Sequence, residues 1–325
     1  MRVLVTGGNG SVGRELVPAL LAGGHDVAVL DRDLGALEVL SSRRLSLVRG
    51  GVEDRAAVQE AMAGAEVVLH LAWSFSDDPA VLVDRDLRGQ QLVLEVARAR
   101  RVRHLVYASS AVVYGKPVRV PIGEDHPLRA LEARKPAYAV AKEAAEKLAL
   151  LAAGTGGPPA TILRFWWAFG EEIGGRHLKD MLAQAAAGTR LRVPAECGGS
   201  FLTLEDLRDA LGVSLLDPRS FGRTFNLASA YVGWEEVARM AVEVTGSGGG
   251  VESVPAAGFD GPAFLADAWR LDDTRFREAF HWAPRRGPAQ VRELLKRAMS
   301  RTWERMAASG PHPHPAPPRR GAGPG

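Results

Sequence analysis

The feature that most constrains this chain is a glycine-rich turn between its first apolar run and its first amphipathic stretch. Arg2–Thr6 is predicted to be a strand and Val12–Ala22 a helix, and the turn that joins them contains Gly7, Gly10 and Gly13. Glycine has no Cβ atom, so it permits a tight turn and lets a helix approach a strand closely. A strand that passes through such a turn directly into a helix is typical of the first βα unit of a parallel sheet.

The rest of the first half repeats this alternation of strand and helix. Further strands are predicted at Asp26–Leu30, Leu45–Val48, Glu66–Leu71, Val102–Ala108 and Thr161–Phe165, and helices at Arg55–Met62, Val81–Arg100 and Ala137–Ala152. These strands are apolar almost throughout, which is what parallel strands covered on both faces require. The pattern therefore predicts an α/β protein with a Rossmann-like, doubly wound parallel sheet.

After Trp166 the rhythm changes, which indicates a second, smaller unit. Helices are predicted at Gly174–Gly188, Leu204–Leu216, Trp234–Thr245 and Gln290–Met306, and short strands at Leu191–Val193 and Thr224–Leu227. We expect a dinucleotide-binding domain at 1–166 and a C-terminal α/β substrate lobe at 167–308, with some chain crossing back to the sheet. Residues 309–325 are rich in Pro, Gly, His and Arg, a composition that predicts a disordered tail.

Composition excludes several classes of protein. The 325 residues carry 41 Lys+Arg against 38 Asp+Glu, a net charge of +3 that is too small to imply a nucleic-acid partner. No apolar run reaches the ~18 residues of a membrane span, and the apolar stretch at the N-terminus is too short for a signal peptide. The one cysteine, Cys197, excludes a disulfide framework and a Cys-rich zinc site. We expect a cytoplasmic protein with no metal site and no membrane partner.

The glycine-rich turn and the second predicted strand together indicate a dinucleotide. Pyrophosphate needs backbone N–H groups at close range and the N-terminus of a helix, and the turn from Gly7 to Gly13 offers both. The second strand leads to Asp31, whose carboxylate can accept hydrogen bonds from ribose hydroxyls and repels a 2′-phosphate. This favours NAD. NADP stays possible, because the neighbouring Arg32 could meet a 2′-phosphate or stack on adenine.

A second set of residues suits proton transfer. Tyr138 and Lys142 lie four residues apart on a predicted helix and so share one face. A free phenol has a pKa near ~10 and is a poor base, but an adjacent ammonium lowers that pKa. Ser110 follows a predicted strand directly, at the carboxyl edge where open parallel sheets bind their ligands. Its hydroxyl could hold a reacting carbonyl or alcohol oxygen, so the three residues are candidate catalytic groups.

Several segments together resemble a known family. They are Thr6-Gly7-Gly8-Asn9-Gly10-Ser11-Val12-Gly13, His70-Leu71-Ala72, Ser109-Ser110-Ala111-Val112-Val113-Tyr114-Gly115 and Tyr138-Ala139-Val140-Ala141-Lys142. With these motifs the chain resembles the extended short-chain dehydrogenase/reductases, and within them the NAD-dependent epimerase/dehydratase group. Weaker similarity continues through Leu163-Arg164-Phe165, Leu204-Glu205-Asp206-Leu207, Phe225-Asn226-Leu227 and Asp272…Phe280-His281-Trp282-Ala283-Pro284.

The resemblance implies a role for each matching residue. Tyr138 would be the acid/base, Lys142 would bind the nicotinamide ribose and tune Tyr138, and Ser110 would bond the substrate oxygen. The cofactor-binding set would be Gly7, Asn9, Gly10, Ser11, Val12 and Gly13 at the pyrophosphate, Asp31 and Arg32 at the adenosine, and Leu71, Ala72, Tyr138 and Lys142 along the cleft. The family also implies a homodimer formed by the helices at Val81–Arg100 and Ala137–Ala152.

The chain departs from the family pattern at several positions. Gly51 stands where an Asp usually meets adenine, Asp86 and Trp167 each replace an Asn, and Gly199 replaces an Arg that commonly holds a nucleotide-sugar phosphate. Ala111-Val112 follows Ser110 where sugar 4,6-dehydratases carry an Asp-Glu pair, so no carboxylate is placed to protonate a leaving hydroxyl. These departures disfavour 4,6-dehydration and weaken the interpretation as a nucleotide-sugar enzyme, since a diphosphate needs cationic or amide donors.

Three functions remain in competition. The leading one is an NAD-dependent epimerase/dehydratase-type enzyme that transfers a hydride on a sugar nucleotide or related polyhydroxylated substrate. The alternative is a reductase of a less polar ketone or aldehyde with a dissociable NAD(P) cofactor. Trp73, Phe75, Trp166, Trp167 and Phe169 motivate it, because they could form a stacking pocket or simply pack in the core. The third is a cofactor-sensing protein without catalysis, against which the intact Ser–Tyr–Lys set argues.

Overall fold

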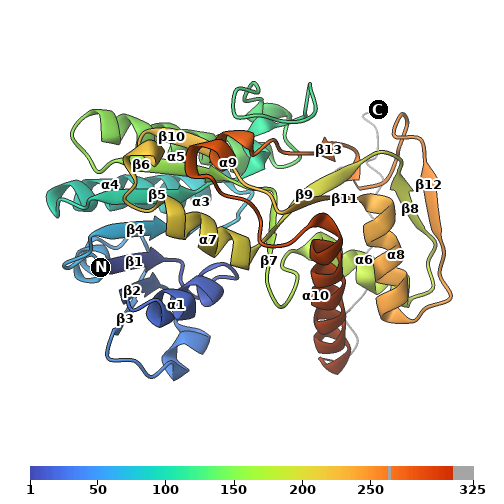
Figure 1. Ribbon diagram of the computed structural model, residues 1–325, viewed down its shortest axis with the longest axis horizontal. Coiled ribbons are helices and arrows are strands. Elements are labelled where there is room, and N and C mark those ends of the chain that lie inside the picture. Colours follow the sequence, from blue (N-terminus) through green and yellow to red (C-terminus); the bar gives the residue numbers. More distant parts are fainter. Residues whose placement is uncertain (263–264, 310–325) are drawn as a thin grey trace, which may run out of the picture.

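The computed structural model describes residues 1–262 and 265–309. Two lobes lie side by side, the larger one containing the N-terminus and the smaller one containing α10 (Figure 1). The disordered tail expected at 309–325 lies outside the described residues, apart from Ser309 at the end of the last helix.

The larger lobe is built on a seven-stranded sheet in which every neighbouring pair is parallel, in the order β10-β6-β5-β4-β1-β2-β3. The strands are β1 Arg2–Thr6, β2 Asp26–Asp31, β3 Leu45–Arg49, β4 Val67–His70, β5 His104–Ala108, β6 Ala160–Arg164 and β10 Arg223–Asn226. The strand order reverses direction beside β1, between β1 and β4, as in a doubly wound sheet. The predicted Rossmann-like fold is confirmed.

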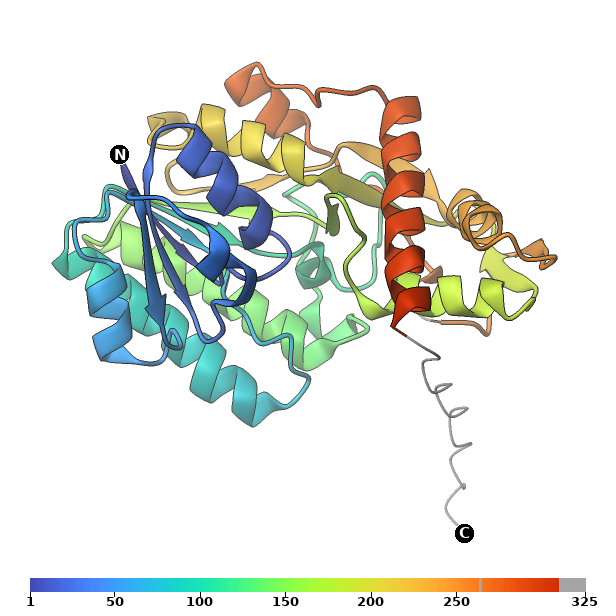
Figure 2. The ribbon, with the colours of Figure 1, turned by 90° about the horizontal axis from the view of Figure 1, so that it is seen from below.

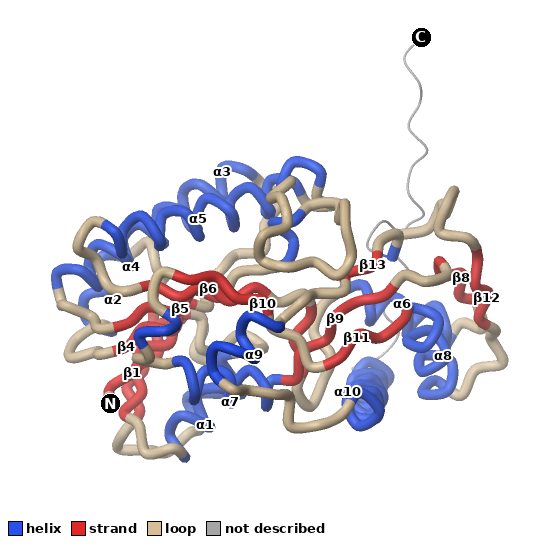
Figure 3. The backbone as a smooth tube through the Cα atoms, turned by 45° about the horizontal axis from the view of Figure 1, so that its top comes forward, coloured by secondary structure: helices blue, strands red, loops and turns tan. Residues whose placement is uncertain are grey.

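Helices cover both faces of this sheet (Figure 3). The helices of one face are α1 Gly13–Ala22, α7 Leu204–Ser214 and α9 Thr274–Phe280; those of the other are α2 Arg55–Ala61, α4 Arg88–Ala99 and α5 Pro136–Gly154. The strands supply alternate side chains to the two cores. Val3 and Val5 of β1 pack with the first group of helices, and Leu4 packs with the second. Burial on both faces explains why the strands are apolar without interruption.

The smaller lobe has its own core. It consists of β7 Trp167–Phe169, β8 Leu191–Pro194, β9 Gly198–Thr203, β11 Ala230–Gly233, β12 Val251–Val254, β13 Ala268–Trp269, α6 Arg176–Ala186, α8 Trp234–Thr245 and α10 Pro288–Ala308. Strand β9 pairs with β7, β11 and β13, and β12 pairs with β8. Phe201 and Trp234 are fully buried at the centre of the lobe. Figure 2 shows α10 standing across the junction of the two lobes.

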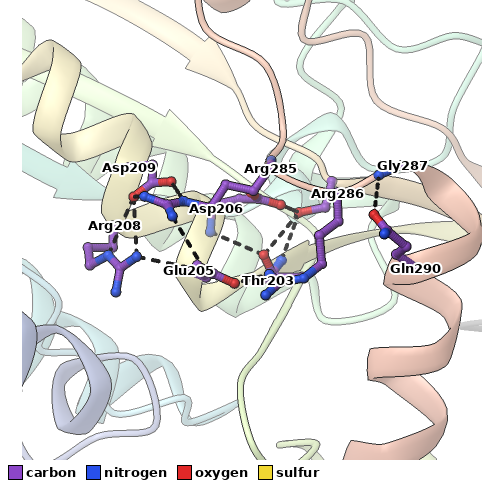
Figure 4. A network of polar contacts seen from close by, with 10 residues as sticks. Thr203, Glu205, Asp206, Arg208, Asp209, Arg285, Arg286, Gly287 and Gln290 are labelled. Atoms are coloured by element: carbon purple, nitrogen blue, oxygen red, sulfur yellow. Dashed lines mark hydrogen bonds and ion pairs between the residues drawn. The ribbon is translucent and has the colours of Figure 1, made fainter.

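The chain returns from the smaller lobe to the larger one twice, at α7–β10 and at α9. The segment between α9 and α10 is fastened to α7 by a polar network (Figure 4). Arg285 donates from its backbone nitrogen to Asp206 Oδ1 over 2.8 Å and pairs through its guanidinium with Asp209, while Arg286 pairs with Glu205. These contacts hold the start of α10 against the helix that packs on the sheet.

Some elements differ from the prediction. The helix expected at Val81–Arg100 begins earlier, at α3 Pro79–Val81, and passes through a π-helical stretch, η2 Leu82–Leu87, before α4. Short 3₁₀ turns occur at η1 Gly35–Val39, η3 Ala111–Tyr114, η4 Ala130–Glu132 and η5 Pro218–Ser220. Six elements were not expected, because each is short and is stabilised by pairing or packing with distant segments. They are the strands β7, β9, β11, β12 and β13 and the helix α9.

Candidate active site

The turn after β1 is held in place by the end of β4. The Oγ1 atom of Thr6 lies 2.7 Å from Nδ1 of the buried His70, and the backbone nitrogen of Ala72 donates to the same oxygen over 3.3 Å. Burial lowers the pKa of His70 to about 3, so its ring is neutral at physiological pH. Gly7 follows with a φ of +70°, and a Cβ atom there would lie 2.7 Å from the Ala72 nitrogen. Only glycine fits this position.

A cleft of about 290 Å³ lies over the carboxyl ends of β1, β2, β3 and β4. It is lined by Gly7, Asn9, Gly10, Leu30, Asp31, Arg32, Gly50, Gly51, Val52, Leu71, Ala72, Trp73, Ser74, Phe75 and Asp86. The lining includes most of the residues predicted to bind the cofactor. Ser11, Val12 and Gly13 continue the same turn into α1, whose first N–H groups have no partner within the helix. The cleft is therefore where the sequence placed the dinucleotide.

The predicted ribose ligand lies at one end of this cleft. Asp31 Oδ2 accepts a hydrogen bond from the backbone nitrogen of Asn9 over 2.9 Å, and Oδ1 accepts one from Asp33 over 3.2 Å. The guanidinium of the neighbouring Arg32 pairs with the carboxylate of Glu53 at 2.7 Å. The backbone contacts fix the Asp31 carboxylate at the edge of the cleft.

Asp86 is a buried carboxylate in the wall of the cleft. It lies in the π-helical stretch, is 4% exposed, and accepts hydrogen bonds from the backbone nitrogen and the hydroxyl of Ser74, at 2.9 and 2.6 Å. Burial raises the pKa of Asp86, while the Ser74 hydrogen bonds and the charge of Lys142 act in the opposite direction. Asp86 thereby anchors the loop that follows β4.

The three candidate catalytic residues converge beyond that loop. Ser110 ends the segment after β5 and caps η3, where its Oγ atom accepts from the backbone nitrogen of Val112 over 3.2 Å. Tyr138 and Lys142 lie one turn apart on α5. Burial raises the pKa of Tyr138, and a hydrogen bond with the Ser110 side chain opposes that effect. The Ser110 side chain therefore lies beside the phenol of Tyr138.

Lys142 is enclosed by aromatic rings. Its Nζ atom donates to the backbone oxygen of Ala108 over 2.9 Å and lies 4.0 Å from the centroid of the Trp73 ring and 4.7 Å from that of Tyr107. Burial lowers the pKa of Lys142 to about 7, although the carboxylates of Asp86 and Glu146 act to raise it. A lysine in this state changes its charge close to neutral pH.

Two aromatic residues cover the phenol ring of Tyr138. The Phe75 ring stacks on it with centroids 5.7 Å apart and planes at 18°, and the Trp73 ring meets it edge-on at 6.3 Å. Phe75 has a φ of +55° and is itself 67% exposed, whereas Tyr138 is only 8% exposed. A phenylalanine in the left-handed region is strained, so the surrounding contacts must hold the loop in this conformation.

A buried ion pair supports the site from behind. Glu146, one turn after Lys142, accepts from Nε and Nη2 of Arg164 over 2.9 and 2.5 Å, and Ser109 donates to the same carboxylate. Arg164 also donates to Tyr114 Oη over 3.1 Å. Sequence reasoning missed this pair. The available signal was a charged residue on the apolar face of the Tyr138 helix, which requires a buried partner.

Within the described ranges, no three His, Cys, Asp or Glu side chains are grouped so that they could hold a metal ion. In the same residues, every helix is too short or too polar to cross a membrane.

A parallel doubly wound sheet with a glycine-rich first turn and a Ser–Tyr–Lys set at its carboxyl edge defines the short-chain dehydrogenase/reductase class. A sequence profile of the NAD dependent epimerase/dehydratase family matches residues 3–228. The chain belongs to this family, and it is therefore an NAD-dependent enzyme of the extended short-chain type.

Curated relatives include both epimerases and ketoreductases. A UDP-glucose 4-epimerase of Lacticaseibacillus casei is 27% identical over 317 residues, which cover 87% of this chain and 92% of the relative. A 4-hydroxy-2-methyl-3-oxo-4-farnesyl-3,4-dihydroquinoline-1-oxide ketoreductase of Stigmatella aurantiaca is 33% identical over 174 residues, 51% of each chain. The relatives therefore differ in the reactions that their names describe.

Solved structures show the same fold. The UDP-glucose 4-epimerase of Thermus thermophilus, crystallised with NAD, has a TM-score of 0.74 and 23% identity, covering 92% of this chain and 99% of that one. The Bordetella bronchiseptica enzyme WbmG in complex with NAD has a TM-score of 0.75 and 22% identity, covering 94% of both chains.

Proposed function

We propose that this protein transfers a hydride between NAD and a carbinol carbon of a small-molecule substrate, and that the leading substrate class is a sugar nucleotide or a related polyhydroxylated compound. The observation that carries the proposal is that Trp73 and Phe75, which line the cleft, pack on Tyr138, with Lys142 beside Trp73 and Ser110 beside the Tyr138 phenol. Membership of the NAD dependent epimerase/dehydratase family supports the same chemistry.

The residues of the cleft fit the cofactor. Gly7 and Gly13 leave no room for a side chain, since a Cβ atom on Gly13 would lie 2.5 Å from the Gly8 Cα atom. Backbone and cofactor can therefore approach closely at the turn, where the start of α1 favours negative charge. In this proposal Asp31 binds the ribose hydroxyls. When bound, NAD supplies the group that accepts or returns the hydride.

The protein's own groups move the proton. The Tyr138 phenol transfers it to or from the substrate oxygen, and Ser110 positions that oxygen through its hydroxyl. Lys142 sits one helical turn away, and a positive charge on its amine stabilises the phenolate form of Tyr138. The ion pair of Glu146 and Arg164 joins α5 to the end of β6, so that the reacting groups keep their positions.

A second candidate is a reductase of a less polar ketone or aldehyde, and one observation favours it. A Cβ atom on Gly199 would lie 2.6 Å from Cε3 of the Trp166 ring, so the indole fills the space in front of that strand. Trp166 also contacts Trp167, with centroids 5.2 Å apart. An aromatic surface suits a planar or apolar substrate better than a phosphate.

One experiment separates these candidates. The protein is purified without added cofactor and denatured, and any released nucleotide is identified by chromatography. Stoichiometric NAD(H) supports a redox-neutral enzyme that recycles its cofactor within each turnover, and sugar nucleotides are then tested first. Protein without nucleotide that binds NADH or NADPH reversibly supports the reductase. Failure of wild-type protein to bind any of these cofactors contradicts both.

Replacing Tyr138 by Phe tests the catalytic assignment. Tyr138→Phe should reduce turnover by at least ~10²-fold, because the proton donor is gone, and should leave the Kd for NAD nearly unchanged. Tyr231→Phe in the smaller lobe, whose hydroxyl donates to the Glu196 carbonyl, is the matched control. Full activity in the Tyr138 variant would show that another group transfers the proton.

We also propose that the protein is a homodimer. Val140, Leu148 and Leu151 lie exposed along one face of α5, and Val83 is exposed on the neighbouring η2 stretch. An apolar stripe on two adjacent helices is what a four-helix interface buries. Light scattering should give twice the mass of the chain, and Leu151→Glu should shift the protein toward the monomer. A wild-type monomer at micromolar concentration would contradict the proposal.

A further inference from the structure

Two aromatic side chains lie between the cleft and the residues proposed to transfer the proton. Trp73 and Phe75 line the cleft, and both pack on the ring of Tyr138. The Trp73 ring also lies over the amine of Lys142, with its centroid 4.0 Å from Nζ. Only 8% of Tyr138 and 4% of Lys142 are exposed. Because the rings that line the cleft also cover the phenol, a molecule that extends from the cleft to Tyr138 must displace them.

The hydride transfer proposed above requires such a molecule. Tyr138 exchanges a proton with the substrate oxygen, and the hydride leaves or joins the carbon that bears this oxygen, over about 3–3.5 Å between the reacting atoms. NAD held at the glycine-rich turn must therefore extend its nicotinamide half toward Tyr138. The cleft measures about 290 Å³, whereas sites for drug-sized ligands begin at roughly 300 Å³ and a dinucleotide is larger than such ligands. The cleft as it stands therefore accommodates only part of NAD.

Polar contacts from η2 and from the start of α5 hold the two rings in place. The rings belong to residues 73–77, which we call the cover. Ser74 donates from its backbone nitrogen and its hydroxyl to Asp86, over 2.9 and 2.6 Å. Asp77 pairs with Lys135, the residue that precedes α5, at 2.9 Å, but its carboxylate is exposed to solvent and the pair is weak. The Ser74 contacts are therefore the stronger fastening of the cover.

The cover has two unfavourable features in this arrangement. Phe75 has a φ of +55°, in the left-handed region that a phenylalanine rarely adopts, and it is largely exposed. The indole nitrogen of Trp73 is buried and has no acceptor among the described residues, although buried indole N–H groups usually have one. Both features lower the free energy that is needed to move the cover, because both costs end when it moves.

We propose that residues 73–77 are a displaceable cover over Tyr138 and Lys142, and that the nicotinamide half of NAD binds only when this cover moves away. The adenosine and pyrophosphate of the cofactor bind the open part of the cleft without moving it. Trp73 therefore reduces the affinity for NAD, because only the fraction of molecules with a displaced cover accepts the whole cofactor. This inference rests on the hydride transfer proposed above.

Isothermal titration calorimetry with ADP and NAD separates the two halves of the cofactor. ADP carries the adenosine and the pyrophosphate but no nicotinamide, so its Kd reports the open part of the cleft alone. Trp73→Ala should lower the Kd of NAD roughly tenfold and leave that of ADP within about twofold of wild type. Ser74→Ala removes one hydrogen bond to Asp86 and alters neither ring, so it should lower the Kd of NAD by about threefold.

The rate of binding distinguishes a cover from a tryptophan that only packs. In stopped-flow fluorescence the observed rate of NADH binding to wild type should level off as the NADH concentration rises, because movement of the cover becomes limiting. In Trp73→Ala the rate should rise linearly over the same range. Trp303→Ala is the matched control, since Trp303 is a half-buried tryptophan of the smaller lobe outside the lining of the cleft. It should keep the plateau and both Kd values.

Two results would overturn the inference. One is a Kd of NAD that falls in neither Trp73→Ala nor Ser74→Ala, with circular dichroism showing that at least one of these variants is folded. The other is a linear rise of the wild-type rate without a plateau. Both leave the proposed hydride transfer untouched, because NAD still binds and Tyr138 still acts. If wild-type protein binds neither ADP nor NAD, the cofactor placement fails and this inference fails with it.

Discussion

The buried amine of Lys142 should make the stability of the cofactor-free protein depend on pH. In the folded protein burial lowers its pKa to about 7, whereas in the unfolded chain the pKa is near the ordinary value of 10.5. Between these two values the unfolded chain binds a proton that the folded protein has released. The free energy of unfolding therefore rises with pH across this window, and the cost of burying the charge is fully present only below pH 7.

The magnitude follows from the linkage relation. Each pH unit within the window adds up to about 1.4 kcal/mol to the free energy of unfolding. The increase is smaller between pH 7 and pH 8, because half of the folded molecules still carry the proton at pH 7. The free energy of unfolding should therefore rise by about 2 kcal/mol between pH 7 and pH 9. Lys142→Met removes the titrating group and fills the same space, so this increment should disappear. The unpaired Ala108 carbonyl adds a cost of about 1 kcal/mol that does not vary with pH.

Other groups with shifted pKa values act outside this window. Burial lowers the pKa of His70 to about 3 and that of His104 to about 4, so both rings are neutral at pH 7. Burial raises the pKa of Tyr138, which keeps its proton throughout. The difference in the free energy of unfolding between wild type and Lys142→Met, taken at each pH, removes every contribution that the two proteins share.

Urea denaturation at pH 7, 8 and 9, followed by circular dichroism, measures the difference. As the pH rises, the free energy of unfolding of the wild type should approach or exceed that of Lys142→Met. The variant should also be inactive at every pH, which separates the role of the amine in turnover from its cost in stability. Parallel pH dependences for the two proteins would refute the argument, because they would mean that Lys142 has an ordinary pKa.

Two further substitutions test the scaffold of the site. Gly7→Ala forces a side chain into the left-handed region and against the loop after β4, so the free energy of unfolding should fall by about 1–3 kcal/mol or more and the affinity for NAD should fall too. Gly24→Ala is the control, because Gly24 also has a positive φ but faces a flexible side chain; it should not change NAD binding in calorimetry. Glu146→Gln leaves the Arg164 charge buried without its partner and should lower the free energy of unfolding, measured by urea denaturation, by about 3–5 kcal/mol. Glu143→Gln, which breaks a pair with an exposed lysine, should lower it by under about 1 kcal/mol. Equal costs for the two glutamates would show that burial does not govern this pair.

The larger lobe could be predicted from sequence because its signals are local. The strands β1, β2 and β5 are unbroken apolar runs next to amphipathic helices, and each run is buried on both faces as its composition requires. In the smaller lobe, β9 is the central strand, yet it begins with two glycines and is defined by partners between about 30 and 70 residues away. No local pattern specifies such a strand.

The same distinction applies to the site. The placement of Ser110, Tyr138 and Lys142 could be expected from the sequence because two of them share a helix face and the third follows a strand. Their catalytic role stays a prediction. The contact of Ser74 with Asp86 depends on how a loop folds back on a π-helical stretch. The stacking of Phe75 on Tyr138 joins residues 63 positions apart. Such contacts exist only once the tertiary structure has formed.

At two positions where the chain has glycine in place of the family's polar residue, another side chain fills the space beside the glycine. At Gly51 the space that a Cβ atom would enter holds the carboxylate of Glu53, which pairs with Arg32. At Gly199 the corresponding space holds the indole of Trp166.

The smaller lobe nevertheless carries a cation close to this second glycine. Gly199 pairs in register with Trp269 of β13, and the next residue, Arg270, places its guanidinium carbon 4.3 Å from the centroid of the Tyr231 ring. If the substrate is a sugar nucleotide, this guanidinium could bind its phosphates, whereas an apolar ketone could pack on the indole of Trp166. The two candidate substrates would therefore use different side chains near Gly199, the Arg270 guanidinium for a phosphate and the Trp166 indole for an apolar ketone.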